Sequence, residues 1–348
     1  MSLSVEIVLF KVFIKQGVNM KATNPRHGSM QFWPRKRASR HYPRVRSWAN
    51  AKDVKLLGFA GYKVGMTQVQ YVDGKKLSPT KGMDVVSPVT IVECPPLKVF
   101  GARAYQKSFY GDNVIAESFS KKDKYLSLKL TANEKKKSKV STLDKVDAKD
   151  LSRVMLVCYT QPSQSNVGKK KPELFEVALG GSVEEQLAYA NENLGKEIAV
   201  SDVFGAGDMV DIHAVTTGKG YQGVIKRFGV ALRVAKSEKG QRRVGARSGG
   251  WTSQAHMMYR VAQPGQMGYH TRTEYNKKIM LVESDPEKIA IKGGIRSYGN
   301  VKNTYLLIYG SIPGPKKRLI RLTKAIRPKK DKIGTPTIDY VSLESQQS

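Results

Sequence analysis

One glycine-rich segment carries the residue types that could cradle a phosphate. Residues 216–223 read TTGKGYQG, so that backbone N–H groups could surround an oxyanion while Lys219 neutralises it. The spacing departs from that of a nucleotide-binding loop, because the first glycine of that motif would fall at His213, and Gly220 follows Lys219 where the motif has Ser or Thr. The segment therefore predicts a tight turn against a backbone phosphate, with a nucleotide pocket as the alternative.

The other residues of catalytic or metal-binding type form no recognisable site. No histidine has a zinc-like spacing to another histidine or to a cysteine. No glycine motif of the dinucleotide-binding type follows an expected strand. Glu238 and Glu274 are isolated among cations, which suits them to orienting an arginine or lysine rather than to acting as a general base. We therefore expect no metal, no cofactor and no small-molecule substrate. The histidines and cysteines are His27, His41, His213, His256, His270, Cys94 and Cys158.

Positive charge is concentrated in three stretches that hold almost no acid. Residues 20–48 contain 8 Lys and Arg and no Asp or Glu, residues 218–278 contain 13 against 2, and residues 315–332 contain 9 against 1. These stretches supply 27 of the formal net charge of +31. Charge placed in this way favours a polyanion as the partner, since each phosphate contact releases condensed counterions. Nucleic acid fits better than a membrane surface, because the stretches have irregularly spaced Gly, Pro and Arg and no amphipathic helical stripe.

The size and composition are those of a folded protein with two domains. The chain has 348 residues, of which 40% are apolar. Its two cysteines are too far apart in sequence to form a secreted disulfide framework, which favours a reducing compartment. Residues 1–19 are too short and too charged to span a bilayer and show no cleavage site. We expect them to be a flexible or mis-assigned leader before a functional start at Met20.

Residues 21–48 are expected to form an extended arm. Pro25, Pro34 and Pro43 interrupt any helix, and Lys or Arg recurs throughout. Aromatic side chains are interleaved with these cations, a pattern that suits stacking on bases or packing in a groove. We expect a partner to order the arm, and a solvated tail is the alternative. The aromatic residues are Phe32, Trp33, Tyr42 and Trp48.

Residues 226–278 are expected to form a long irregular loop. They include seven glycines and one proline and are too polar to form a core of their own. Trp251 follows the pair Gly249 and Gly250 and has few apolar neighbours in sequence, so we expect a loop tip inserted between nucleotides rather than a core residue. Forked donors for phosphate are supplied by Arg242, Arg243, Arg247, Arg260 and Arg272.

Residues rich in β-branched and aromatic side chains predict a mainly β fold. The expected strands lie in both halves of the chain, which favours a β-barrel assembled from both, with the middle looped out as an insertion. The ranges are 54–72, 85–93, 208–217, 278–283, 288–292 and 303–310.

The insertion is expected to be α+β. Ser182 and Glu185 form a capping box before apolar residues at helical spacing, and Gly195 can close that helix. A similar segment starts at Ser141 with Asp144 and runs into an apolar strand at 154–160. Residues 161–173 are turn-rich and basic, which predicts an exposed loop.

Four motifs in this order resemble one known family. They are RHGSMQFWPRKRASR at 26–40, GFAGYKVGMTQV at 58–69, TGKGYQGVIKRFG at 217–229 and QPGQMGYHTRTEYNKKI at 263–279. The chain from about residue 20 onwards is similar to the universal large-subunit ribosomal protein L3 family in its archaeal and eukaryotic form.

This resemblance implies a six-stranded translation-type β-barrel with an inserted α/β domain, an N-terminal extension and a long central loop, all docked on large-subunit rRNA. In the family the loop reaches toward the peptidyl transferase centre, and Trp251 matches a tryptophan near its tip that influences accommodation of aminoacyl-tRNA. The sequence departs from the family pattern in two places. Thr252 and Ser253 follow Trp251 where relatives commonly have His-Pro or Asn-Pro, and residues 236–239 lack a histidine that many relatives carry there.

The expected organisation follows from the residues and the resemblance together. The ranges are a leader at 1–19, a basic arm at 20–50, a barrel at 51–100 and 203–315 that contains the loop 226–278, an inserted domain at 101–202 and a basic C-terminal extension at 316–348. The loop tip is Gly249, Gly250 and Trp251. The expected rRNA-binding residues are Arg26, His27, Arg35, Lys36, Arg37, Arg40, Arg44, Arg46, Lys219, Lys226, Arg227, Arg242, Arg243, Arg247, Trp251, Arg260, His270, Arg272, Lys277, Lys316, Lys317 and Arg318.

The resemblance, together with the concentrated positive charge, implies a non-enzymatic rRNA-binding protein of the large ribosomal subunit, in the cytoplasm, beside other large-subunit proteins and away from membranes. Neutralised phosphates would let rRNA segments approach, and the glycine-rich loop would fill narrow gaps. An RNA-modifying or RNA-cleaving enzyme and a free translation factor are the alternatives. The first lacks a nucleophile, base or cofactor site, and the second lacks a nucleotide-binding domain.

Overall fold

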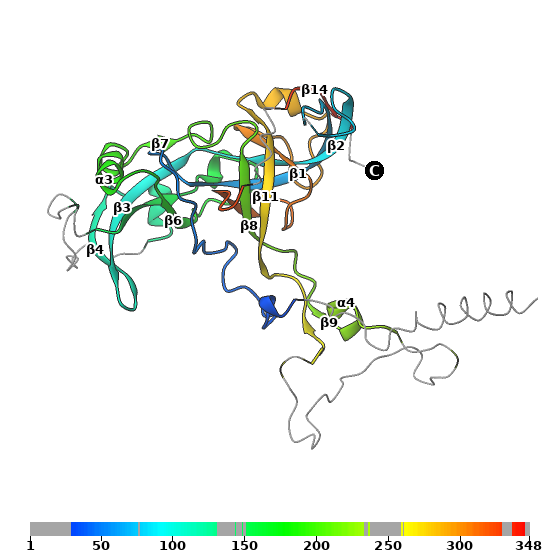
Figure 1. Cartoon of the computed structure of the whole chain (residues 1–348), viewed down its shortest axis with the longest axis horizontal. Coiled ribbons are helices and arrows are strands. Elements are labelled where there is room, and N and C mark those ends of the chain that lie inside the picture. The colour runs from blue at the N-terminus through cyan, green and yellow to red at the C-terminus, as the bar shows by residue number, and fades with distance from the viewer. Residues whose placement is uncertain are drawn as a thin grey trace, which may run out of the picture. The chain divides into compact units, whose positions relative to one another are not determined.

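The chain divides into two compact units, a smaller one of residues 1–37 and 218–268 and a larger one of residues 38–217 and 269–348. Both main sheets belong to the larger unit (Figure 1). The computed structural model describes residues 29–75, 77–130, 143, 148, 151–232, 236, 259, 261–328 and 336–344.

Seven strands of the larger unit form one antiparallel sheet in the order β13-β8-β11-β12-β2-β1-β14. Strand β13 pairs with β1 as well as with β8, so the pairings of six strands return to the strand at which they began. The sheet therefore joins segments from both halves of the chain. The strands are β1 (Gly58–Val72), β2 (Asp84–Glu93), β8 (Met209–Val215), β11 (Thr271–Glu283), β12 (Tyr305–Tyr309), β13 (Leu319–Lys324) and β14 (Ile338–Val341).

Close packing of these strands depends on the residue types in them. Residues 210–215 of β8 are all buried, as expected of a short strand with few charges in its sequence. At Gly61 of β1, a Cβ would lie 2.6 Å from both the Cys94 sulfur and a Val92 methyl group. Glycine is therefore required where β1 crosses β2.

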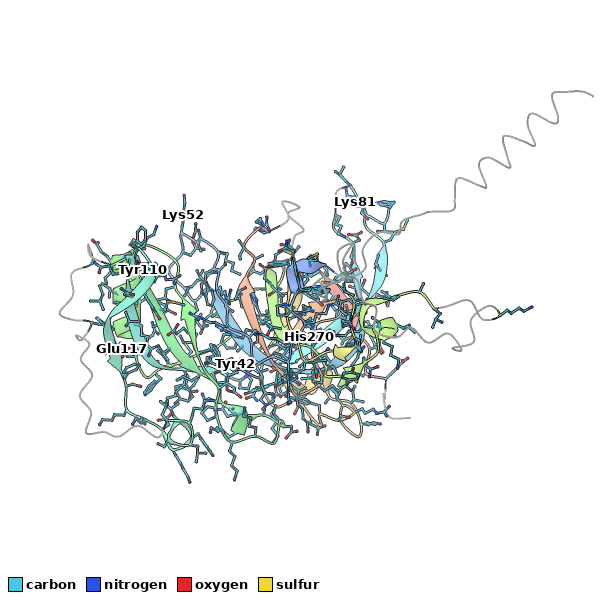
Figure 2. The ribbon with its side chains drawn as sticks, turned by 90° about the horizontal axis from the view of Figure 1, so that it is seen from below. Tyr42, Lys52, Lys81, Tyr110, Glu117 and His270 are labelled. Atoms are coloured by element: carbon cyan, nitrogen blue, oxygen red, sulfur yellow. The ribbon has the colours of Figure 1, made fainter. Side chains whose placement is uncertain are left out.

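A second sheet is built from residues between β2 and β8. Its order is β4-β3-β5-β6, with β7 paired to β3. Helix α3 (Val183–Glu192) packs against it, and the Gln186 side chain accepts a hydrogen bond from the Val154 backbone N–H at 2.9 Å. The β3–β4 hairpin ends at the exposed Tyr110 (Figure 2). The strands are β3 (Leu97–Ser108), β4 (Gly111–Phe119), β5 (Arg153–Tyr159), β6 (Leu174–Ala178) and β7 (Glu197–Ile198), and the short helix α2 spans Lys124–Ser127.

The two sheets share one hydrophobic core. Ile91 of β2 and Leu156 of β5 belong to the same cluster of buried side chains. Both cysteines, Cys94 and Cys158, are buried and free. The larger unit is thus a single packed body, although its sheets come from different parts of the chain.

The smaller unit contains short elements on either side of the expected central loop. Strand β9 (Tyr221–Gln222) pairs with β10 (Gly265–Gln266), and helix α4 (Val224–Phe228) follows β9 directly. Gly229 has φ 66°, a left-handed conformation that ends α4. The 3-10 helix η1 (Met30–Phe32) lies in the N-terminal part.

Several expected elements are found with changed boundaries. The capping box of Ser182 and Glu185 is present, and α3 ends at Glu192 rather than at Gly195. The expected strand at 54–72 begins at Gly58, and that at 278–283 is the end of the longer β11. Ser141 and Asp144, the expected start of a second such segment, lie outside the described residues, whereas the strand expected at 154–160 is β5.

Other expectations were wrong. Residues 288–292 do not form a strand, because the 3-10 helix η5 (Pro286–Ile289) begins at a proline that cannot donate to a sheet. The segment 226–278 that was expected to be irregular contains the end of helix α4, strand β10 and the start of β11. Strand β13 lies inside 316–348, the range expected to be an extension. Its pairing with β1 and β8 was not visible in a local pattern that two cations, Arg321 and Lys324, interrupt.

Candidate nucleic-acid interface

Residues 38–50 of the arm present a row of cations on the larger unit. Arg40, Arg44 and Arg46 are exposed, whereas Pro43 and Val45 between them are buried. This alternation arises because one side of the arm packs on the protein. These residues therefore owe their order to the protein itself and not to a partner, and the three cations keep a fixed spacing.

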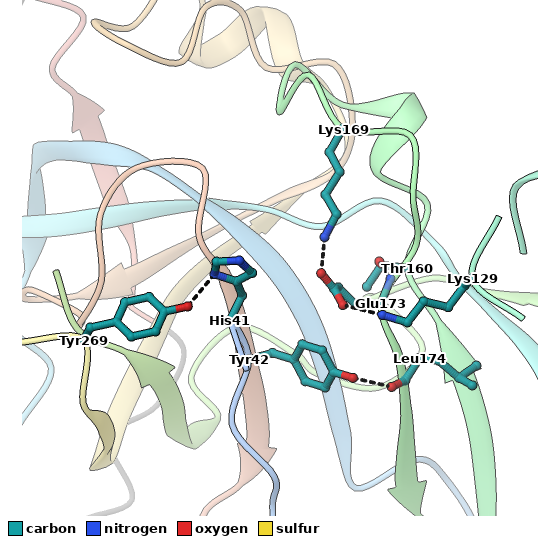
Figure 3. A network of polar contacts seen from close by, with 8 residues as sticks. All are labelled: His41, Tyr42, Lys129, Thr160, Lys169, Glu173, Leu174 and Tyr269. Carbon is teal, nitrogen blue, oxygen red and sulfur yellow. Dashed lines mark hydrogen bonds and ion pairs between the residues drawn. The ribbon is translucent and has the colours of Figure 1, made fainter. Parts of the chain in front are cut away.

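Tyr42 and Trp48 anchor this part of the arm. The Tyr42 hydroxyl donates to the Leu174 carbonyl at 3.1 Å (Figure 3). Trp48 packs against the core. These two aromatic residues of the arm, for which stacking on bases or packing in a groove was expected, thus make internal contacts.

The first described residues of the arm pack within the smaller unit. Trp33 lies against Phe228, with ring centres 5.3 Å apart, and against Tyr259 at 6.3 Å. The Arg35 guanidinium stacks 4.2 Å from the Phe228 ring centre and donates to the Arg227 carbonyl. Lys36 and Arg37 are exposed.

Two neighbouring candidate cations of helix α4 differ in what they contact. Arg227 donates to the carbonyls of Gln266 at 2.9 Å, Gln263 at 2.8 Å and Arg35 at 3.0 Å. Burial lowers the pKa of its guanidinium. Lys226, one residue earlier, is exposed. Arg227 therefore clamps backbone segments of the smaller unit together, and Lys226 remains open to a partner.

The glycine-rich segment that contains Lys219 is hydrogen-bonded to the backbone around Met267. The Lys219 N–H donates to the Met267 carbonyl, and the Met267 N–H donates to the Gly220 carbonyl, both at 2.9 Å. Gly220 has φ 66°, as a tight turn requires. The Lys219 N–H is thus engaged within the protein, so this residue can offer an anion its exposed ammonium group.

A cluster around Tyr269 fixes the arm to the start of β11. The Tyr269 hydroxyl and His41 Nδ1 are 2.6 Å apart (Figure 3), and the Ala38 N–H donates to the Tyr269 carbonyl at 2.9 Å. The Arg318 guanidinium lies 5.1 Å from the Tyr269 ring centre. His270 is buried, and its N–H donates to the Thr216 hydroxyl at 3.1 Å.

Arg272 lies on β11, two residues beyond His270 in the chain. Its guanidinium donates to the Thr271 carbonyl at 2.9 Å, and burial lowers its pKa. It is partly exposed, so it is only in part available to a partner.

Two further candidate cations donate hydrogen bonds to backbone carbonyls in or near the turn before β13. Lys277 donates to the Ser311 carbonyl at 3.0 Å, and Lys316 donates to the Arg296 carbonyl at 2.7 Å. Burial lowers the pKa of Lys316. Lys317, the next residue, is exposed.

The remaining candidates lie outside the described residues. They are Arg26, His27, Arg242, Arg243, Arg247, Gly249, Gly250, Trp251 and Arg260.

Three residues that line a cavity were not among the binding residues expected from the sequence. His41, Tyr62 and Lys169 line a cavity together with residues 315–319. His41 lies within the cationic arm and Lys169 within the basic stretch GKKK at 168–171, so charge density offered a signal for both. Tyr62 lies inside an apolar strand and offered none.

No metal-ligand cluster occurs in the described part of the chain, where no three His, Cys, Asp or Glu side chains come together suitably. Within the same residues, no helix has both the length and the apolar character that a membrane span needs.

A mainly β protein that holds exposed cations on an ordered arm belongs to the broad class of basic proteins suited to polyanions. The sequence model of the family described as Ribosomal protein L3 matches residues 18–348. The chain therefore belongs to the ribosomal protein L3 family, and the resemblance seen in its four motifs is confirmed.

Curated relatives from archaea agree with this assignment. The protein named "Large ribosomal subunit protein uL3" of Archaeoglobus fulgidus is 46% identical over 332 residues, which cover 94% of this chain and 99% of the relative. Proteins of the same name from Methanococcus vannielii and Methanosphaera stadtmanae are 43% and 45% identical, covering 95% and 93% of this chain and 99% and 98% of those relatives.

Proposed function

We propose that this protein is a structural, non-enzymatic component of the large ribosomal subunit that binds rRNA and stabilises its folding and assembly. Family membership and the names of the archaeal relatives support the assignment to the large subunit. The observation that carries rRNA binding is the row of exposed Arg40, Arg44 and Arg46 on an arm held in place by its buried residues. Cations at fixed spacing can neutralise successive phosphates without first being ordered.

The finer organisation is part of the same proposal. The closed circuit of six strands acts as a translation-type β-barrel, the sheet between β2 and β8 as an inserted domain of about residues 101–202, and both as an anchor for the basic extensions. The loop 226–278 reaches toward the peptidyl transferase centre, with Trp251 near its tip. The partners are large-subunit rRNA and neighbouring ribosomal proteins in the cytoplasm, with no membrane and no small-molecule substrate.

Sedimentation tests the proposed location. A cell lysate is washed with high salt and resolved on a sucrose gradient, and each fraction is probed for this protein. Retention in the large-subunit peak at one copy per particle is expected. Release into the light fractions would contradict a core structural role.

Salt-dependent binding to purified large-subunit rRNA tests the role of the arm. Replacing Arg40, Arg44 and Arg46 together by Gln should reduce the slope of log affinity against log salt by about 2, since each lost phosphate contact removes roughly 0.7–0.9. Lys52→Gln, another exposed cation, is the single-charge comparison. An unchanged slope in the triple variant would show that the arm does not contact phosphates.

A further inference from the structure

A cavity of about 330 Å³ lies in the larger unit beside the arm. Its volume is at the lower end of the range of roughly 300–1,000 Å³ for ligand pockets. It therefore has room for one small chemical unit and not for a folded segment. The lining residues are His41, Tyr62, Val167, Lys169, Glu173, Pro315, Lys316, Lys317, Arg318 and Leu319.

The charges around the cavity favour an anion. Glu173 is the acid among the lining residues, and it is already paired with Lys169 and, at 3.4 Å, with Lys129 (Figure 3). The other cations of the lining lie in the turn Pro315–Leu319, where Lys317 is exposed. Glu173 is thus engaged by its own lysine partners and does not offset the positive charge of this turn.

The turn that supplies these cations is fixed by hydrogen bonds from Lys63. The Lys63 ammonium donates to the carbonyls of Ile312 at 2.6 Å and Gly314 at 2.9 Å. The Lys317 N–H donates to the Lys63 carbonyl at 2.7 Å, and Lys317 has φ 67°, which is unfavourable for a residue with a side chain. An unfavourable conformation held by several contacts is typical of binding sites.

One polar group at the cavity lacks the partner that buried groups normally have. The Arg318 Nη1 atom is buried without an acceptor among the described residues. Because buried donors are nearly always satisfied, it is a group that a ligand could pair. The Tyr62 hydroxyl, in a residue that is 3% exposed, has Thr160 as its hydrogen-bond partner.

We infer that this cavity receives a single unstacked nucleotide of the rRNA, with its phosphate at Lys317 and Arg318 and its base beside His41 and Tyr62. This inference rests on the proposed function and adds which part of the rRNA the cavity binds. Unpaired bases are commonly held against aromatic or histidine rings and arginine planes, and the cavity offers all three. His41 lies between Arg40 and Arg44 in the chain, so an RNA backbone that follows the arm passes the cavity. An isolated phosphate would leave the apolar wall at Val167 uncovered.

The test uses the full chain bound to purified large-subunit rRNA, with base and ribose reactivity measured at every nucleotide. The double variant Tyr62→Phe with Lys317→Asn keeps the ring and a residue that tolerates positive φ. It should restore the reactivity of one unpaired nucleotide and weaken binding by about tenfold, as expected when one charged phosphate contact is lost. Lys170→Ala, an exposed cation that does not line the cavity, should leave every protection in place.

The outcomes separate this inference from the proposed function. If the wild-type protein binds rRNA and every protection survives in the double variant, the cavity inference is overturned and the proposed function stands. Loss of protection across the whole footprint in the double variant would also overturn it. In a competition measurement, inorganic phosphate that displaces the rRNA as well as a free nucleotide does would overturn it too. If the wild-type protein shows no salt-dependent binding to the rRNA, the proposed function itself fails.

Discussion

The Arg321 guanidinium lies 4.5 Å from the centre of the Phe175 ring, and Arg321 is only 4% exposed. It donates to the Glu176 carbonyl at 2.6 Å and to the Pro43 carbonyl at 3.3 Å. One side chain of β13 therefore holds the arm and strand β6 together. Burial lowers the pKa of Arg321 to about 10, so the group is still charged at neutral pH.

Replacing Arg321 by Met should destabilise the protein by about 2–4 kcal/mol, because two buried carbonyls lose their donors. The free energy of unfolding in urea at pH 7 measures this. Arg46→Met, at an exposed position of the arm, should change it by less than about 0.5 kcal/mol. Equal effects of the two substitutions would contradict the role assigned to Arg321.

Stability should fall in mild acid because of His213. Its ring nitrogens lie 2.9 Å from the Thr273 hydroxyl and 3.1 Å from that of Thr323. Burial, and then the charge of Arg321, lower its pKa from 6.5 to about 4, although Asp211 acts in the opposite direction. The unfolded chain therefore binds a proton more readily than the folded protein does.

The contribution of His213 is complete above pH 6.5 and is lost as pH falls toward 4, by about 3 kcal/mol in total. Urea unfolding of wild type and His213→Gln at pH 7.5, 6 and 4.5 measures the difference. The wild type should lose more stability than the variant over this range. Parallel pH profiles would show that His213 does not titrate as its surroundings require.

Glu93 should be essential to the connection between β2 and β12. It is fully buried, and its Oε1 accepts from the Lys302 N–H at 2.9 Å and from Asn303 Nδ2 at 2.8 Å, while Oε2 accepts from the Tyr298 hydroxyl. Glu93→Ala should cost about 3 kcal/mol in unfolding free energy, because several donors remain unpaired. Tyr298→Phe removes one donor only and should cost about 1 kcal/mol. The prediction fails if the two variants unfold at the same urea concentration.

Adjacent cations of α4 should give opposite results. Arg227→Lys keeps the charge but removes the forked guanidinium that donates to three carbonyls. Amide hydrogen exchange at residues 263–268 should therefore accelerate. The slope of log affinity for rRNA against log salt should stay the same. Lys226→Gln should lower the slope by about 1 and leave exchange unchanged. Exchange and salt slope changing together in both variants would refute this division.

The sequence alone determined features whose causes are local. The capping box of Ser182 and Glu185, the β-rich segments near β2 and β8, and the concentration of cations in the arm depend on residues close together in the chain. The four motifs also indicated the family, because they occur in a fixed order. Local patterns failed at β13, where the strand exists because β1 and β8 pair with it.

Only the tertiary structure decided which cations face outward. Arg227, Lys277 and Lys316 have the same charge as Lys226 and Lys317, yet their donors bond to carbonyls of the protein itself. Arg321, inside a basic stretch, is buried by residues more than a hundred positions away. Charge is a property of each residue, whereas availability for a partner depends on distant segments that the folded chain brings beside it.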